Sequence, residues 1–338
     1  MRTTVAIAQI TPLILDAHTG VRAAADAVAE AARAGARIIV FAETWLGGYP
    51  AWAFGHAGWS DPTGRKLYGD LLRESVVLRA GADGHSVNDD LSPLRTAARA
   101  HDAVVVIGAN ERSSPHSGTV FNSLITIGTD GRTVNVHRKT TPTLTEKLVH
   151  APGDAAGLGA VDTPHGRLGG LICWEHWNPL ARAAAHATEE QIHVAAWPDF
   201  PEAHLLASRS YAYEGRTFVL AAAQYLPREA VPAALQEAFQ LGAGSGETGP
   251  FFDGGSCIIA PDGSWILEPQ YGNEGVFVRE LDLAVIPDEH YALDVNGHYG
   301  RPDIFDLRVR AERRSPVTRI PRELVTAPSV EHGDDRGE

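Results

Sequence analysis

Three reactive side chains each follow a stretch of sequence that is typical of a strand. Glu43 follows Ile-Ile-Val-Phe-Ala, Lys139 follows Val-Asn-Val-His-Arg, and Cys173 follows Leu-Gly-Gly-Leu-Ile. Residues at strand ends in α/β proteins often converge in one crevice, where a carboxylate, an ammonium and a thiol would meet. The carboxylate can accept the thiol proton, and the ammonium can stabilise negative charge that develops in a transition state. The pattern therefore predicts a thiol nucleophile with a base and a cation beside it.

Each of these residues also has a common structural explanation. A glutamate after a strand is usually solvated or caps a helix, and a loop lysine is usually solvated. A cysteine after an apolar strand is more often a small buried hydrophobic residue than a nucleophile. The other cysteine, Cys257, lies within Gly-Gly-Ser-Cys-Ile-Ile, which is a strand pattern, and we interpret it as a core residue.

The sequence after Cys173 predicts a turn from a strand into a helix. Pro179 suits the first turn of a helix, and the Ala-rich residues after it favour helix formation. A thiol close to a helix N-terminus lies near free backbone N–H groups, which favour the thiolate form. We therefore expect a reactive thiolate at Cys173.

Strands and helices alternate along the chain, with several hairpins inserted between them. Apolar runs predict strands at 5–10, 37–41, 103–109, 120–127, 133–138, 166–172, 193–196, 217–223, 255–260, 264–267 and 276–281. Helices are predicted at 19–34, 91–101, 179–188 and 203–215, and the segment 44–79 is predicted to be irregular. This order favours an α/β protein with a mixed sheet or two stacked sheets covered by helices.

The composition is that of a globular protein and excludes several classes of partner. The chain has 338 residues, of which 44% are hydrophobic and 21% charged, and its formal net charge is −13. This negative charge argues against nucleic acid or an anionic membrane as a partner. Two cysteines imply no disulfide framework, and no apolar run is long enough to span a bilayer. We expect a cytoplasmic protein.

Four longer segments resemble the nitrilase superfamily of carbon–nitrogen hydrolases, and its nitrilase branch in particular. They are Phe-Ala-Glu-Thr-Trp-Leu-Gly-Gly-Tyr-Pro at 41–50, His-Arg-Lys-Thr-Thr-Pro-Thr-Leu-Thr-Glu at 137–146, Cys-Trp-Glu-His-Trp-Asn-Pro-Leu at 173–180 and Gly-His-Tyr-Gly-Arg-Pro-Asp at 297–303. The resemblance implies Glu43 as general base, Lys139 as the charge-stabilising residue and Cys173 as nucleophile. It also implies that Glu146 is a second carboxylate that positions Lys139 and substrate.

The resemblance further implies a fold, an assembly and a reaction. The fold would be a four-layer αββα sandwich, with residues 1–315 as a single hydrolase domain and 316–338 as a C-terminal extension. Family members pair through the helices after the nucleophile, so a homodimer or larger homo-oligomer is expected. The reaction would convert a small nitrile to a carboxylic acid and ammonia, with some amide where the C–S bond breaks first. No cofactor and no metal are expected.

Two other functions remain open at this point. An amidase or carbamoylase of the same superfamily would use the same residues on an amide. A catalytically silent assembly protein would use the fold as a scaffold, although it would have no chemical need for all four reactive residues.

Aromatic side chains near the reactive residues are candidates for the substrate pocket. Pockets combine an apolar lining with a few polar groups, and residues that follow the strand ends at this edge fit that description. The candidates are Tyr49, Trp52, Trp174, His176, Trp197 and Pro198. A packed loop or a subunit contact would explain Tyr49 and Trp52 equally well.

Overall fold

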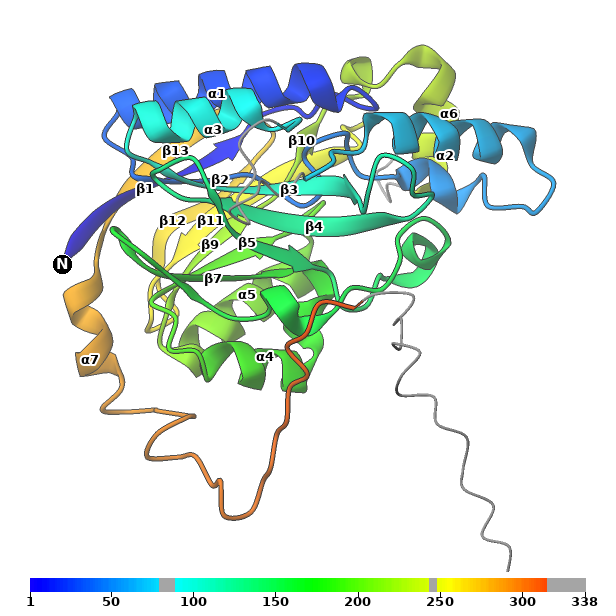
Figure 1. Ribbon diagram of the computed structural model, residues 1–338. Helices are drawn as coiled ribbons and strands as arrows, with labels where there is room; N and C mark the ends of the chain where they lie inside the picture. The colour runs from blue at the N-terminus through cyan, green and yellow to red at the C-terminus, as the bar shows by residue number, and fades with distance from the viewer. Residues whose placement is uncertain (79–88, 243–247, 315–338) are drawn as a thin grey trace, which may run out of the picture.

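The computed structural model describes residues 1–78, 89–242 and 248–314 (Figure 1). The predicted C-terminal extension at 316–338 lies outside the described residues. Among the helices that are described, none is long and apolar enough to cross a membrane.

The described residues form two sheets that lie face to face. The first has six strands in the order β13-β1-β2-β3-β4-β5, and the second has seven, in the order β10-β11-β9-β8-β7-β6 with β12 paired to β11. The strands of the first sheet are β1 (Arg2–Gln9), β2 (Ile38–Val40), β3 (Val104–Arg112), β4 (Val120–Ile127), β5 (Thr133–Arg138) and β13 (Gly275–Asp282). Those of the second are β6 (Val161–Thr163), β7 (Gly166–Ile172), β8 (Ile192–Ala196), β9 (Phe218–Ala222), β10 (Tyr225–Leu226), β11 (Phe252–Ile259) and β12 (Trp265–Tyr271).

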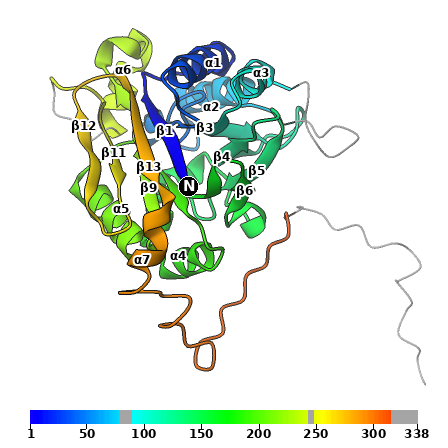
Figure 2. The same cartoon turned by 90° about the vertical axis from the view of Figure 1, so that its left-hand side faces the viewer.

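Helices cover the outer faces of both sheets. Figures 1 and 2 show α1 (Ala17–Arg33) and α3 (Ser92–Ala100) over the first sheet, and α4 (Pro179–His186) and α5 (Glu202–Gly215) over the second. The predicted αββα sandwich is therefore confirmed. The remaining helices are α2 (Pro62–Glu74), α6 (Ala233–Gly242), α7 (Ile286–Glu289) and the short 3-10 helices η1 (Ala51–Phe54), η2 (Leu144–Leu148), η3 (Ala155–Gly157), η4 (Cys173–Trp177), η5 (Arg228–Ala230) and η6 (Leu283–Val285).

Parallel strands occupy the middle of each sheet, where both faces are covered. In the first sheet β1, β2 and β3 run parallel, and in the second β7, β8 and β9 do. Every residue of β2, β8 and β9 is buried, which explains why their sequences are apolar, apart from His193 in β8, and do not alternate. Antiparallel pairing adds the outer strands, and the sheets are mixed as predicted.

The prediction that 44–79 is irregular is wrong, because α2 forms within it. Pro62 occupies the first turn of α2, and the side chain of Asp61 accepts a hydrogen bond from the N–H of Thr63 as its N-cap. The buried face of this helix is small, with Leu67 and Leu71 as its large apolar residues. So short an apolar stripe gives little periodic signal beside the Trp, Gly and Pro residues that precede it. The short α6 and β6 were likewise not predicted.

Candidate active site

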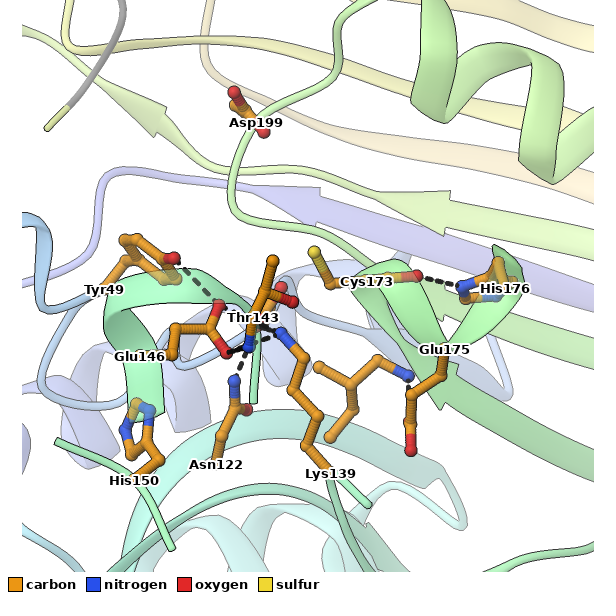
Figure 3. A network of polar contacts seen from close by, with 12 residues as sticks. Tyr49, Asn122, Lys139, Thr143, Glu146, His150, Cys173, Glu175, His176 and Asp199 are labelled. Atoms are coloured by element: carbon orange, nitrogen blue, oxygen red, sulfur yellow. Dashed lines mark hydrogen bonds and ion pairs between the residues drawn. The ribbon is translucent and has the colours of Figure 1, made fainter. Parts of the chain in front are cut away.

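Four residues predicted from the sequence meet in the interior of the protein: Glu43, Lys139, Glu146 and Cys173. Figure 3 shows three of them, Lys139, Glu146 and Cys173. One carboxylate oxygen of each glutamate and Sγ of Cys173 all lie within 4.8 Å of one another. Each of the four residues is at most 3% exposed. Segments far apart in the sequence therefore assemble one group of reactive side chains around a single sulfur atom.

The ammonium of Lys139 links the two carboxylates. Nζ lies 2.8 Å from Oε1 of Glu43, and 2.9 and 2.8 Å from the two carboxylate oxygens of Glu146. Burial lowers the pKa of Lys139, but the nearby Cys173 and both carboxylates outweigh it and hold that pKa above its ordinary value. Lys139 is therefore a cation at neutral pH.

Glu43 follows β2 and is placed as a general base would be. Oε1 accepts hydrogen bonds from Lys139 and from Nδ2 of Asn122, whereas Oε2 is buried and has no hydrogen-bond partner among the described residues. Complete burial raises the pKa of Glu43 to about 7, against the lowering effect of Lys139. A carboxyl with this pKa can both accept and return a proton near neutral pH.

Cys173 is the first residue of η4 and has an unusual backbone conformation, with φ at 53°. A non-glycine residue in this left-handed region costs roughly 1–3 kcal/mol, so the surrounding contacts must hold it in place. The expectation of a resting thiolate is wrong, because burial and the carboxylate of Glu43 raise the pKa of the thiol well above its ordinary value, although Lys139 lowers it. The sulfur therefore carries its proton until a base removes it.

Glu146 is in η2 and is fixed by three kinds of donor. Besides Lys139, its carboxylate accepts hydrogen bonds from the hydroxyl of Tyr49 at 2.8 Å and from the N–H of Thr143 at 3.0 Å. Burial raises the pKa of Glu146, but Lys139 outweighs that effect and the pKa is lowered overall. Glu146 is thus the permanent anion of the group, and Glu43 is the carboxyl that can titrate.

A metal ion would need the space that Lys139 occupies. Glu43, Glu146 and Cys173 could supply ligand atoms by their spacing. However, the Lys139 ammonium already lies within hydrogen-bond distance of both carboxylates and neutralises part of their charge. The donor set is therefore occupied by a side-chain cation.

The six predicted pocket residues differ in their placement. Tyr49 contacts Glu146 directly, and Trp52 is buried in the same apolar cluster as Tyr49. Trp174 is 51% exposed. Pro198 is buried, and its carbonyl oxygen accepts a hydrogen bond from the N–H of Gln224, which lies between β9 and β10.

His176 and Trp197 have their polar atoms engaged within the protein. Both ring nitrogens of His176 lie within hydrogen-bond distance of other protein atoms, and Nε1 of Trp197 donates to Oγ of Ser208. The two rings stack on each other, with centroids 4.9 Å apart. They support the nucleophile from inside the core, and a direct contact with substrate stays a prediction for all six residues.

Sequence reasoning missed three polar residues at this site: Asn122, Glu175 and Asp199. Asn122 is a buried polar residue of β4, a strand that also contains Ser123 and Thr126, and an amide among the apolar residues of this strand was a usable signal. Glu175 connects the residue before Cys173 to the residue after Lys139. Its carboxylate accepts hydrogen bonds from the N–H of Ile172 and from the N–H and hydroxyl of Thr140. Asp199 lies on the side of Cys173 away from Lys139 in Figure 3 and contributes to raising the thiol pKa.

Comparison with known proteins identifies the family. The carbon-nitrogen hydrolase model matches residues 4–288. An aliphatic nitrilase from Rhodococcus rhodochrous is 33% identical, with 94% of this chain and 81% of that protein covered. An arylacetonitrilase from Aspergillus kawachii is 32% identical, with 93% of each chain covered. The chain belongs to the carbon-nitrogen hydrolase family, and the resemblance found in the sequence is confirmed.

Solved structures agree on the fold. Nit3 from Saccharomyces cerevisiae, a member of branch 10 of the nitrilase superfamily, has a TM-score of 0.66 at 16% identity, with 88% of this chain and 96% of that chain covered. At this identity the likeness concerns the fold alone.

Proposed function

We propose that this protein is a nitrilase, which hydrolyses an organic nitrile to a carboxylic acid and ammonia. The observation that carries the proposal is the buried group in which the Glu43 and Glu146 carboxylates and the Cys173 sulfur lie within 4.8 Å of one another, with Lys139 bonded to both carboxylates. Relatives named as nitrilases, 32–34% identical over most of this chain, support the same reaction. The substrate class is then a small nitrile.

In the first step the sulfur of Cys173 forms a bond to the nitrile carbon. Its proton passes to Glu43, whose Oε2 is unpartnered among the described residues and whose pKa of about 7 suits it to accept and then return a proton. Negative charge develops on the nitrile nitrogen, where the Lys139 ammonium and the N–H of Trp174 can stabilise it. Return of the proton to nitrogen gives a neutral thioimidate.

Two water molecules complete the reaction. The first adds to the thioimidate carbon, the C–N bond breaks, ammonia leaves, and a thioester remains. The second adds to the thioester, the C–S bond breaks, and the thiol regains its proton as the acid departs. If the C–S bond breaks before ammonia leaves, the product is an amide. Glu43 transfers the proton in each step, and Glu146 keeps Lys139 in position.

Replacement of each cysteine tests the proposal. Cys173→Ala and Cys173→Ser should release no ammonia from nitriles, and an electrophile should form a mass adduct on Cys173 in the unmodified protein. Cys257 is the matched control, because it is fully buried in β11 and burial raises the pKa of its thiol. Cys257→Ala should therefore keep its activity. Ammonia release by either Cys173 variant would end the proposal.

An amidase or carbamoylase is the weaker candidate, since relatives that are 33–34% identical to this chain are named as nitrilases. The rates of ammonia release from a nitrile and from its matched amide distinguish the two functions. A silent assembly protein is disfavoured by the complete reactive group, and thiol-selective labelling of Cys173 would exclude it.

We also propose that the protein pairs through α4 and α5. Leu180, Leu206 and Tyr213 on these helices are 64%, 61% and 50% exposed, which supports burial of this face in a homodimer or larger assembly. Light scattering after gel filtration tests the assembly, and Leu206→Glu should weaken it. A cytoplasmic location and a single hydrolase domain over residues 1–315 remain proposals. Cell fractionation tests the first, and truncation after residue 315 with retained activity tests the second.

A further inference from the structure

A chain of buried polar side chains leads from the backbone of Cys173 into the second sheet. Nδ1 of His176 lies 2.7 Å from the carbonyl oxygen of Cys173, a contact drawn in Figure 3, and Nε2 of His176 lies 2.9 Å from Nε2 of His193. Nδ1 of His193 lies 2.9 Å from Oε2 of Glu190. The three side chains are 1%, 0% and 6% exposed, so they depend on one another for hydrogen bonds.

These contacts fix the number of protons on the two histidines. A carbonyl oxygen only accepts, so Nδ1 of His176 carries hydrogen. The contact between the two Nε2 atoms requires one more hydrogen, on one ring or the other. A carboxylate also only accepts, so Nδ1 of His193 carries the third. Two neutral imidazoles hold two N–H groups in total, and three are required here. With Glu190 ionised, the histidine pair therefore carries one positive charge.

The contacts place this charge on His193, because its Nδ1 lies 2.9 Å from the Glu190 carboxylate whereas Nδ1 of His176 faces a neutral carbonyl oxygen. Burial raises the pKa of Glu190, but His193 and His186 outweigh it and hold that pKa below its ordinary value, which keeps Glu190 ionised. Burial, and the charge of His193, lower the pKa of His176 to about 3, so His176 is neutral. The ring of Tyr211 stacks on His193 with centroids 3.8 Å apart and donates its hydroxyl to Oε1 of Glu190.

More distant charged groups on α4 and α5 complete the surroundings. Nδ1 of His186 lies 3.4 Å from Oε1 of Glu190. Glu214 lies 3.8 Å from His186 and pairs with Arg182 at 2.7 Å. Arg182 in turn donates to the carbonyl oxygen of His176 at 3.0 Å. None of these three described side chains forms a hydrogen bond to a ring nitrogen of His193 or His176.

The hydrogen bond from His176 to the Cys173 carbonyl oxygen also sets the orientation of the whole Cys173–Trp174 peptide. The carbonyl of Cys173 and the N–H of Trp174 belong to one planar peptide and point in opposite directions. Fixing the oxygen therefore fixes the direction of the Trp174 N–H, next to a residue, Cys173, whose backbone is left-handed. Donation to the carbonyl also polarises the peptide and strengthens its N–H as a donor.

We propose that His193 and His176 are positioning residues that hold and polarise the Cys173–Trp174 peptide, so that the Trp174 N–H stabilises the negative charge formed on the substrate. This inference rests on the proposed function, since it assigns that N–H a role in the reaction. Glu190 belongs to the same unit, because it keeps the extra proton on His193.

The proton count can be measured without any substrate. Nitrogen-15 NMR of histidine-labelled protein near pH 7.5 distinguishes protonated from bare ring nitrogens. The resonances are assigned with His176→Asn and His193→Gln. We expect three protonated nitrogens on these two rings in the unmodified protein, and two in Glu190→Gln. Two neutral rings in the unmodified protein would overturn the inference, whether or not the protein hydrolyses nitriles.

Kinetics of His193→Gln test the positioning role. Loss of one hydrogen-bond donor to the substrate's developing negative charge lowers kcat by about 10²–10³-fold. A weakened Trp174 N–H should therefore lower kcat by about tenfold or more, with little change in KM. Alkylation of Cys173 by iodoacetamide should change by less than about twofold, because no charge develops near the Trp174 N–H in that reaction. His165→Gln is the control and should retain its kcat, because this ring lies in the turn between β6 and β7 and contacts the carbonyl oxygen of Asp102. An unchanged kcat in His193→Gln, or an equal loss of alkylation, would contradict the role.

The two failures are distinguishable. If the unmodified protein releases no ammonia from any nitrile, the proposed function fails, while the NMR count still decides the state of the histidine pair. If nitriles are hydrolysed and His193→Gln turns over normally, only the positioning role fails.

Discussion

The pH dependence of activity should report the protonation of Glu43, and Asn122 should set where it occurs. Glu43 acts as a base only when it is ionised, and burial raises its pKa to about 7. Activity is therefore present above this pH and is lost as the pH falls below it. Nδ2 of Asn122 donates to Oε1 of Glu43, and this hydrogen bond favours the ionised form.

Asn122→Leu removes that donor and keeps a side chain of similar volume. A hydrogen bond to a charged group contributes about 1.5–3 kcal/mol, and 1.36 kcal/mol corresponds to one pH unit. The acid limb of kcat/KM should therefore move upward by about one to two pH units. At pH 6, kcat/KM should fall by about 10- to 100-fold, while the plateau at high pH should change little.

The assay is ammonia release from an uncharged nitrile at low substrate concentration between pH 5 and 9. Asn135→Leu is the matched control, because Asn135 on β5 bonds to the backbone of Gly157 away from the reactive group. Glu146→Gln should move the limb in the opposite direction, since the charge of Glu146 raises the pKa of Glu43. An acid limb that stays in place in Asn122→Leu would refute the reasoning.

Three further predictions concern neighbouring residues. Glu175→Gln should lower the free energy of unfolding by about 3–5 kcal/mol, because it breaks a buried charge network; urea denaturation measures it, and a loss below about 1 kcal/mol would contradict this. Asp199→Asn should speed alkylation of Cys173 at pH 8, since the Asp199 charge raises the thiol pKa. An unchanged rate would show that the Asp199 charge does not act on the thiol. Gly108→Ala should abolish activity, because a Cβ there would lie 2.7 Å from Cα of Glu43 and displace the general base. A normal kcat would show that the backbone accommodates the methyl group without moving Glu43.

The sequence was most informative where the local pattern and the tertiary structure agree. The apolar runs predicted β2, β7 and β8, in which small and apolar residues predominate because both faces of each sheet are covered, although β7 contains Arg167 and β8 contains His193. The four reactive positions were predicted from motifs, since no local pattern states which strand ends will meet. Their convergence depends on two sheets stacking in one particular way.

Other features could not be predicted from local sequence. The left-handed backbone of Cys173 arises from contacts that are made only in the folded protein. The resting state of its thiol was mispredicted. The nearby helix N-terminus favours a thiolate, but burial and the carboxylates of Glu43 and Glu146 have the larger effect and raise the thiol pKa. Likewise, the extra proton on His193 depends on packing between η4, β8 and α5, which the spacing of histidines does not reveal.

The pairing of β1 with β13 has a consequence for synthesis of the chain. Residues 2–9 pair with residues 275–282, so one side of β1 lacks its final neighbour until nearly the whole chain has left the ribosome. At ribosomal speeds of about 5–20 residues per second, that interval is roughly 15–50 s. During this time an apolar strand with free backbone N–H and C=O groups can recruit another nascent chain. Chaperone supply, more than the stability of the finished protein, should therefore set the yield of soluble protein during rapid expression.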